Sequence, residues 1–197
     1  MEMSGEERIA ATQDQTWTAL NDPEILKACV PGCESIERVA ENEYLVLMVA
    51  RIGPVSAKFK GKLVLSELDP PNSYAIDFEG QGGAAGFGKG AARVQLRPEG
   101  AGTLLEYQVK ASVGGKLAQI GSRLVDAAAQ KVAGDFFAAF NERMSSLHAV
   151  AGHAGEVHHL PLPVPRDPDL PDVTPGSLAF FAAGALVVFI VALIALL

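Results

Sequence analysis

Residues 105–144 read LEYQVKASVGGKLAQIGSRLVDAAAQKVAGDFFAAFNERM and contain a change of hydrophobic period. Up to Val113 the apolar residues occupy every second position, which is typical of a strand with one buried face. After Gly114 and Gly115 they occur at every fourth position, which predicts a helix of about 28 residues. The apolar positions that define this helix are Ile120, Leu124, Ala128, Val132, Phe136, Phe140 and Met144. A strand therefore leads directly into a long amphipathic helix.

The chain before this stretch repeats the two-residue period. Residues 55–65 alternate apolar side chains with serine and lysine, and residues 74–78 and 93–97 alternate in the same way. Prolines and glycines at 70–72 and 98–100 are typical of turns between strands. We therefore predict an α+β domain over residues 1–147, in which a curved antiparallel sheet of about seven strands surrounds the long C-terminal helix.

Short elements are expected at the N-terminus. Residues 2–9 suit a strand. Thr12 can cap a helix that continues to Leu20, and the Asp22-Pro23 pair is a good start for a second short helix. The Pro31-Gly32 turn should end that second helix.

The C-terminal residues have a different character. Residues 178–197, LAFFAAGALVVFIVALIALL, carry no charge and would form a helix of about 30 Å, the thickness of a bilayer's hydrocarbon core. Residues 148–177 hold all four histidines and six prolines, which predicts a semi-extended flexible linker. The N-terminus has no apolar segment typical of a signal peptide. We expect a cytoplasmic globular domain held by a single-pass C-terminal anchor in a bacterial cytoplasmic membrane.

Charge and motif content exclude several classes of function. The 16 lysines and arginines against 23 acidic residues, a formal charge of −7, disfavour a general nucleic-acid-binding surface. The glycine-rich run at 80–90 contains G-x-x-x-x-G-K, but Gly90 and a strand follow the lysine, so a phosphate-binding loop is not expected. We interpret this run as a flexible flap that carries Phe87 over the opening of a cavity.

No residue set suited to catalysis or metal binding stands out. The folded body has no histidine, and its carboxylates lie mostly on the polar faces of strands. Cys29 and Cys33 have neither the spacing of a redox motif nor partners for zinc, so we interpret them as small thiols beside a turn; a regulatory disulfide is the alternative. The sequence favours a binding protein over an enzyme, with no catalytic residue and no metal.

The middle of the long helix is rich in small residues. Ala127, Ala128, Ala129 and Gly134 lie where bulky side chains would be needed to fill the space between helix and sheet. One interpretation is a pocket at the centre of the domain. The other is that small residues let the helix pack closely on the sheet.

Four stretches together resemble the G-subunit family of carbon monoxide dehydrogenase, which belongs to the START-like, helix-grip superfamily. They are KACVPGCESIE (27–37), IGPVSAKFKGKLVLSELDPPNSY (52–74), GQGGAAGFGKGAA (80–92) and VGGKLAQIGSRLVDAAAQKVAGDFF (113–137). The resemblance implies a seven-stranded helix-grip domain with an apolar cavity. It also implies association with a molybdenum-containing carbon monoxide dehydrogenase, or a related cytoplasmic oxidoreductase, and transport of a respiratory quinone, menaquinone or ubiquinone.

The quinone hypothesis predicts a set of lining residues. They come from the helical cap, the inward strand faces, the glycine-rich run and the long helix: Trp17, Leu26, Val30, Phe59, Phe78, Phe87, Ile120, Leu124 and Ala128. A rival hypothesis is a docking or maturation factor without a ligand, because residues 44–49 form a strand that is apolar on both faces. An enzyme of the same fold is disfavoured because no acid–base residue presents itself.

Overall fold

The computed structural model describes the backbone of residues 1–153 and the side chains of residues 1–147. The predicted anchor at 178–197 and nearly all of the predicted linker lie outside the described residues. Within residues 1–153, no helix is both long enough and apolar enough to cross a bilayer.

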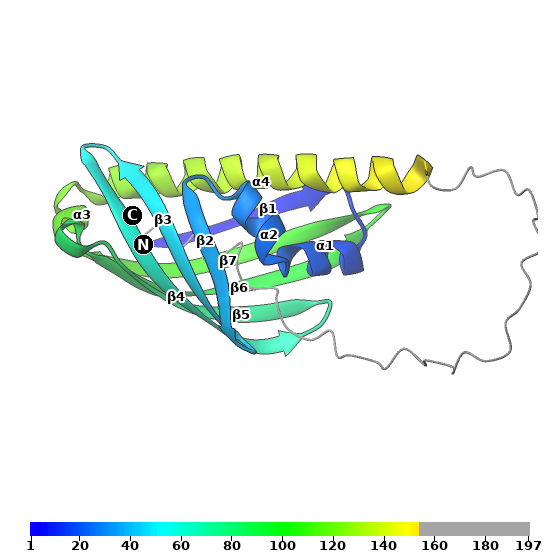
Figure 1. Ribbon diagram of the computed structural model, residues 1–197, viewed down its shortest axis with the longest axis horizontal. Helices are drawn as coiled ribbons and strands as arrows, with labels where there is room; N and C mark the ends of the chain where they lie inside the picture. The colour runs from blue at the N-terminus through cyan, green and yellow to red at the C-terminus, as the bar shows by residue number, and fades with distance from the viewer. Residues whose placement is uncertain (154–197) are drawn as a thin grey trace, which may run out of the picture.

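Seven strands and a long helix make up most of the domain (Figure 1). In chain order the elements are β1 (Glu2–Ile9), α1 (Gln13–Leu20), α2 (Pro23–Cys29), β2 (Cys33–Ala40), β3 (Glu43–Ile52), β4 (Val55–Asp69), β5 (Ser73–Gln81), the 3₁₀ turn η1 (Gly83–Ala85), β6 (Phe87–Glu99), β7 (Gly102–Gly114), α3 (Lys116–Gln119) and α4 (Ser122–His153).

The strands form one antiparallel sheet in the order β1-β7-β6-β5-β4-β3-β2. Strands β2 to β7 pair with their neighbours in sequence, whereas β1 pairs with β7 at the far edge. The helix α4 runs along one face of the curved sheet (Figure 1). The predicted α+β helix-grip arrangement is confirmed for the described residues.

The long helix differs in detail from its prediction. Gly121, with φ of +93°, separates the short α3 from α4, which begins at Ser122. The buried positions of α4 are Val125, Ala129, Ala133, Phe136, Phe137, Phe140 and Met144. A four-residue step advances about 40° beyond one turn of an α-helix. The predicted series therefore drifts across the helix surface, and its early member Leu124 is 50% exposed.

Aromatic rings join the second half of α4 to the sheet. Phe136 packs edge-on against Phe137 with ring centroids 5.2 Å apart and stacks on Phe140 at 5.6 Å. Phe137 also stacks on Tyr107 of β7, at 5.6 Å. At the edge of the sheet, Asn141 accepts a hydrogen bond from the Ala10 N–H and donates one to the Arg8 carbonyl. These contacts attach α4 to β7 and to the end of β1.

The two N-terminal helices begin where the sequence predicts. Thr12 and Gln15 form a capping box at α1, and the Asp22 carboxylate accepts hydrogen bonds from the Glu24 and Ile25 N–H groups at α2. Each cap satisfies backbone donors that have no partner within the helix. The second helix packs against α4 and β2, which places the following turn beside α4.

Gly32 is required in that turn for two reasons. Its φ of +74° is a left-handed conformation, and a Cβ there would lie 2.2 Å from the Val49 carbonyl oxygen. The Gly32 carbonyl also accepts a hydrogen bond from the Val49 N–H at 2.9 Å. The turn between α2 and β2 is therefore in close contact with the backbone of β3.

Two glycine-to-alanine substitutions should change stability in opposite directions. Gly32→Ala should lower the free energy of unfolding by at least about 2 kcal/mol, because it combines left-handed strain with a clash against backbone. Gly134→Ala, in α4 with no heavy atom within 4 Å of the new Cβ, should raise it by about 0.5–1 kcal/mol. Urea denaturation of both variants measures the difference. Equal effects would contradict the geometry of the α2–β2 turn.

Candidate ligand-binding groove

The nine predicted lining residues occupy three kinds of position. Leu26, Val30, Phe59 and Phe78 are buried in the core. Trp17, Ile120 and Ala128 are partly buried and pack against it. Phe87 and Leu124 are each 50% exposed. The structure therefore does not gather all nine around one space.

The centre of the domain is packed. Leu63, Ala129, Phe136 and Phe140 have no exposed surface, so none of them borders a space that a water molecule could enter. Ala129 and Ala133 face the sheet and are buried, which favours the close-packing interpretation of the small residues at these two positions. The open central cavity that we expected is therefore absent beside these residues.

Glycines on the concave face of the sheet contribute to this close packing. Gly61, Gly80 and Gly88 are buried and lie side by side on β4, β5 and β6. In the neighbouring rows, a Cβ at Gly82 would lie 2.1 Å from the Phe59 ring, and one at Gly90 would lie 2.5 Å from the Phe78 ring. Phe78 therefore lies across Gly90 of the next strand and Phe59 lies across Gly82, just after β5, so both rings cover the inner surface of the sheet.

The glycine-rich run does not form a flap over a cavity. Gly82, Ala85 and Gly86 make a turn closed by backbone hydrogen bonds, and Ala85 is only 7% exposed. Phe87 is the first residue of β6, opposite Gly114, and its ring lies against Gly114 on the outer face of the sheet. The prediction that Phe87 covers the interior is wrong. Counting back in steps of two from the inward Val94 places Phe87 on the outer face. The outward position of Phe87 could therefore have been predicted from the alternation in the sequence.

An open groove lies instead between α4 and β3. It has a volume of about 410 Å³ and passes the Pro31-Gly32 turn. Its apolar floor includes Met48, Ala50 and Ile52 of β3, which are buried, and its more accessible apolar wall consists of Ala128 and Val132 of α4. Its polar groups are Arg51, Lys131 and Asp135. Of the predicted residues, Ala128 lines the groove. Leu124, one turn earlier, lies 3.8 Å from the Cβ position of Gly53 at the β3–β4 turn.

Charged side chains lie on the helix side of this groove. Lys131 and Asp135 form an ion pair one turn apart on α4, and both are exposed. Arg51, also exposed, forms no ion pair with any described acidic side chain. Because Arg51 faces outward, the neighbouring Ala50 and Ile52 must face inward. The position of Arg51 in the sequence already indicates which alternate residues of β3 face α4. The sequence prediction did not use it, because the strand is apolar on both faces.

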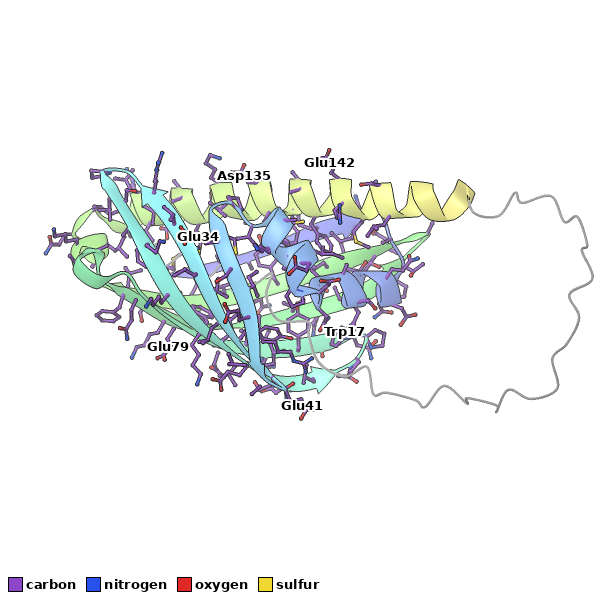
Figure 2. All side chains as sticks on the ribbon, viewed as in Figure 1. Trp17, Glu34, Glu41, Glu79, Asp135 and Glu142 are labelled. Carbon is purple, nitrogen blue, oxygen red and sulfur yellow. The ribbon has the colours of Figure 1, made fainter. Side chains whose placement is uncertain are left out.

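Trp17 lies at the other end of the domain. It extends from α1 toward the start of β5 (Figure 2), and its ring packs edge-on against Tyr74 at 5.5 Å. The Tyr74 hydroxyl is buried without a hydrogen-bond partner among the described residues, and burial raises the pKa of this phenol well above its ordinary value. Trp17 therefore packs against a buried tyrosine and does not line the groove between α4 and β3.

Comparison with known proteins identifies the family. The family model that describes the G subunit of carbon monoxide dehydrogenase (CoxG) matches residues 5–145. The chain belongs to the CoxG family. No curated protein matches the chain.

Solved structures agree with this family's expected fold. The chain is similar to a conserved protein from Geobacillus kaustophilus, with 30% identity, a TM-score of 0.70, and coverage of 74% of this chain and 96% of that one. A START superfamily protein from Mycobacterium smegmatis matches at 17% identity and a TM-score of 0.54, covering 74% and 98% of the two chains. A protein from Thermus thermophilus matches at 20% identity and 0.58, covering 75% and 99%. The last two likenesses concern the fold alone.

The two thiols of this CoxG protein are weakly acidic. Burial raises the pKa of Cys33 to about 11, although Lys27 opposes the shift and Glu34 adds to it. Burial also raises the pKa of Cys29, against the effect of Arg143. Among the described residues, no group of three histidine, cysteine, aspartate or glutamate side chains is placed to hold a metal ion.

Alkylation should report these raised pKa values. At pH 8 the Cys33 thiolate fraction should be roughly a hundredfold lower in the folded protein than in the unfolded chain, because the pKa rises from 9.0 to about 11. Iodoacetamide should therefore modify Cys33 slowly without denaturant and rapidly in guanidinium, as followed by peptide mass spectrometry. A free cysteine in an unfolded peptide is the reference. Equal rates in the two conditions would contradict the raised pKa.

Proposed function

We propose that this CoxG-family protein is a membrane-anchored accessory protein of a molybdenum carbon monoxide dehydrogenase, and that it carries a respiratory quinone between the bilayer and the enzyme. The observation that carries the proposal is the apolar groove between α4 and β3. Family membership supports the association with carbon monoxide dehydrogenase. The quinone and the membrane role go beyond what family membership supports, and they are part of the proposal.

The groove has the size and chemistry for part of a prenylated quinone. Its volume of about 410 Å³ falls in the range of about 300–1,000 Å³ of small-molecule sites. Burial of prenyl groups against the partly buried Ala128 and Val132 would contribute about 25 cal/mol per Å² of apolar area. Arg51 and Lys131 at the rim can donate hydrogen bonds to quinone carbonyl oxygens.

Carrying, without chemical turnover, fits the residues around the groove. Its titratable side chains are Arg51, Lys131 and Asp135, of which the last two pair with each other. The redox chemistry would belong to the quinone, and the protein would bind and orient it. Menaquinone and ubiquinone share the carbonyl groups and the prenyl tail on which this argument depends.

An anchor would make such a carrier effective. The sequence predicts a membrane segment at 178–197 and a proline-rich linker at 148–177. A linker of this kind keeps the domain within reach of the bilayer and raises its local concentration there. The proposed location is the cytoplasmic face of a bacterial membrane, where a cytoplasmic oxidoreductase can meet the domain.

Filling the groove tests the carrier proposal. Ala128→Trp should block the space between α4 and β3, and Ala127→Trp, on the exposed side of the same turn, is the matched control. Mass spectrometry of lipid extracts from the natively purified full chain should recover a quinone from the parent and from Ala127→Trp. Recovery from Ala128→Trp should fall about tenfold or more, equivalent to a loss of at least about 1.4 kcal/mol in binding.

Two results would overturn this proposal. One is the absence of any isoprenoid quinone from the parent extract. The other is equal recovery from Ala128→Trp and Ala127→Trp when circular dichroism shows both variants folded.

The exposed apolar residues on the outer face of the sheet favour a second candidate, a docking factor for the dehydrogenase. Leu45 on β3 is 44% exposed and Val64 on β4 is 38% exposed. Leu45 lies opposite Lys62, and Val64 lies opposite Glu43 in the adjacent register. The pair therefore forms a small apolar area with charged neighbours, as at the surfaces of transient complexes.

A single charge substitution tests the docking candidate. Leu45→Lys should reduce co-purification of the dehydrogenase, because it places a charge at the centre of the apolar area. Leu147→Lys, at a residue of α4 that is also 44% exposed, is the control. If both variants retain the enzyme equally, the outer face around Leu45 is not the docking surface. Loss of the enzyme with full recovery of quinone would assign docking and carrying to different surfaces.

A further inference from the structure

Acidic residues are absent from three long segments of this acidic protein. Residues 44–66, 80–98 and 107–125 contain four, three and three lysines or arginines, ten of the 16 in the chain, and none of the 23 acidic residues. An acidic residue borders each segment at both ends: Glu43 and Glu67, Glu79 and Glu99, and Glu106 and Asp126. The chain as a whole has a formal charge of −7, so its charges are strongly segregated.

The topology brings these segments together. In a meander of antiparallel strands, the β3–β4 turn, the β5–β6 turn and the exit from β7 all lie at the same end of the sheet. Figure 1 shows the β3–β4 turn, α3 and the start of α4 at its left end, opposite α1. Cross-strand register places Lys60 opposite Gln81, which lies opposite Phe87. It also places Glu79 between Lys62 on β4 and Lys89 on β6.

Five exposed cations at this end form no ion pair with a described acidic side chain. They are Arg51, Lys60, Lys89, Lys116 and Arg123, which we call the basic end. By contrast, Lys58, Lys62 and Lys110 pair with Glu34, Glu43 and Glu2. The basic end therefore presents an excess of positive charge to a partner, with Glu79 opposite Lys89 as its nearest cross-strand acidic neighbour.

Two large apolar side chains are exposed among these cations. Phe87, 50% exposed, is two residues before Lys89 on the outer face of β6. Leu124, also 50% exposed, follows Arg123 and lies against the β3–β4 turn at Gly53. At the opposite end, Glu67 and Asp69 lie at the end of β4 and Glu99 at the end of β6, and there Glu67 pairs with Arg93 and Glu99 with Arg8.

We infer that the basic end docks on the surface of an anionic lipid bilayer, with Phe87 and Leu124 entering the headgroup region. Clustered lysines and arginines are attracted to anionic headgroups, and exposed aromatic and leucine side chains gain by partition into the interface. The apolar pair distinguishes this surface from a purely electrostatic one. The proposed carrier function explains why such docking would be useful, and the inference rests on it in that respect. The evidence for the docking itself is the charge distribution.

Docking in this orientation would bring the groove close to the bilayer. Arg51 belongs both to the basic end and to the groove, and Leu124 precedes the groove residue Ala128 by one helical turn. A lipophilic ligand would then pass between the bilayer and the groove over a short path. The opposite end of the sheet and α1 would face away from the membrane.

Fluorescence quenching tests the orientation in the full chain. The only tryptophan of the parent, Trp17, lies away from the basic end and gives the background signal. Phe87→Trp adds a probe at the basic end, and Leu147→Trp adds one on α4 far from it. Each chain is reconstituted in vesicles of brominated phosphatidylcholine, with and without phosphatidylglycerol, so that any tether is the same in all.

We expect lipid bromines to quench the Phe87→Trp probe in vesicles that contain phosphatidylglycerol, and to leave the Leu147→Trp probe at background. The quenching should largely disappear on raising the salt from about 0.1 M to about 1 M, because the screening length falls from about 10 Å to about 3 Å. It should also disappear with Lys60→Glu, Lys89→Glu and Lys116→Glu together. The control with the same change of net charge, Arg8→Glu, Lys27→Glu and Arg97→Glu, should retain it.

Several outcomes would overturn the inference. Equal quenching of the two probes, quenching independent of phosphatidylglycerol, or equal loss in both charge-reversal variants would each do so. If no vesicle quenches the Phe87→Trp probe and reversal at the basic end abolishes dehydrogenase co-purification, the partner is an acidic protein surface. Quinone recovery is measured separately, so the two proposals can fail independently. Quenching of the probe without any recovered quinone would refute only the carrier proposal. Recovered quinone without quenching of the probe would refute only the docking.

Discussion

The close packing of α4 on the concave face of the sheet is the constraint on which the rest of the structure depends. Ala129 and Ala133 are buried on the side of the helix that faces the sheet, and the rings of Phe59 and Phe78 are buried on the inner surface of the strands. The rings of Phe136 and Phe140 then fill the wider space toward the C-terminal end of the helix. Because the centre is filled, the space that we propose for a ligand lies along the side of α4, beside β3.

Much of the fold could be predicted from sequence because the signals are local and repeated. The change of period at Gly114, the Thr12 and Asp22 caps and the proline-containing turns each specify an element with little influence from the rest of the chain. The return of β1 to the far edge beside β7 is different. It depends on pairing between residues about a hundred positions apart, which no local pattern encodes.

The candidate site was predicted less well, for two physical reasons. A four-residue step is not the period of an α-helix, so the position of Leu124 could not be derived from that of Phe136. The strand β3 is apolar on both faces, so alternation alone does not show which side chains face α4, although Arg51 settles the question. Ala128 was identified because small residues in the middle of the helix mark the part of its surface that borders either a pocket or a closely packed sheet.

The segregation of charge that we infer would also give the domain an electric dipole directed toward the basic end. In the field above a negatively charged surface, such a molecule experiences a torque as well as an attraction, and the torque acts before any contact is made. A tether that permits free rotation would then be sufficient, because the surface itself would select the approaching face. The linker would only have to limit the distance between the domain and the bilayer. It would not have to set the orientation of the domain.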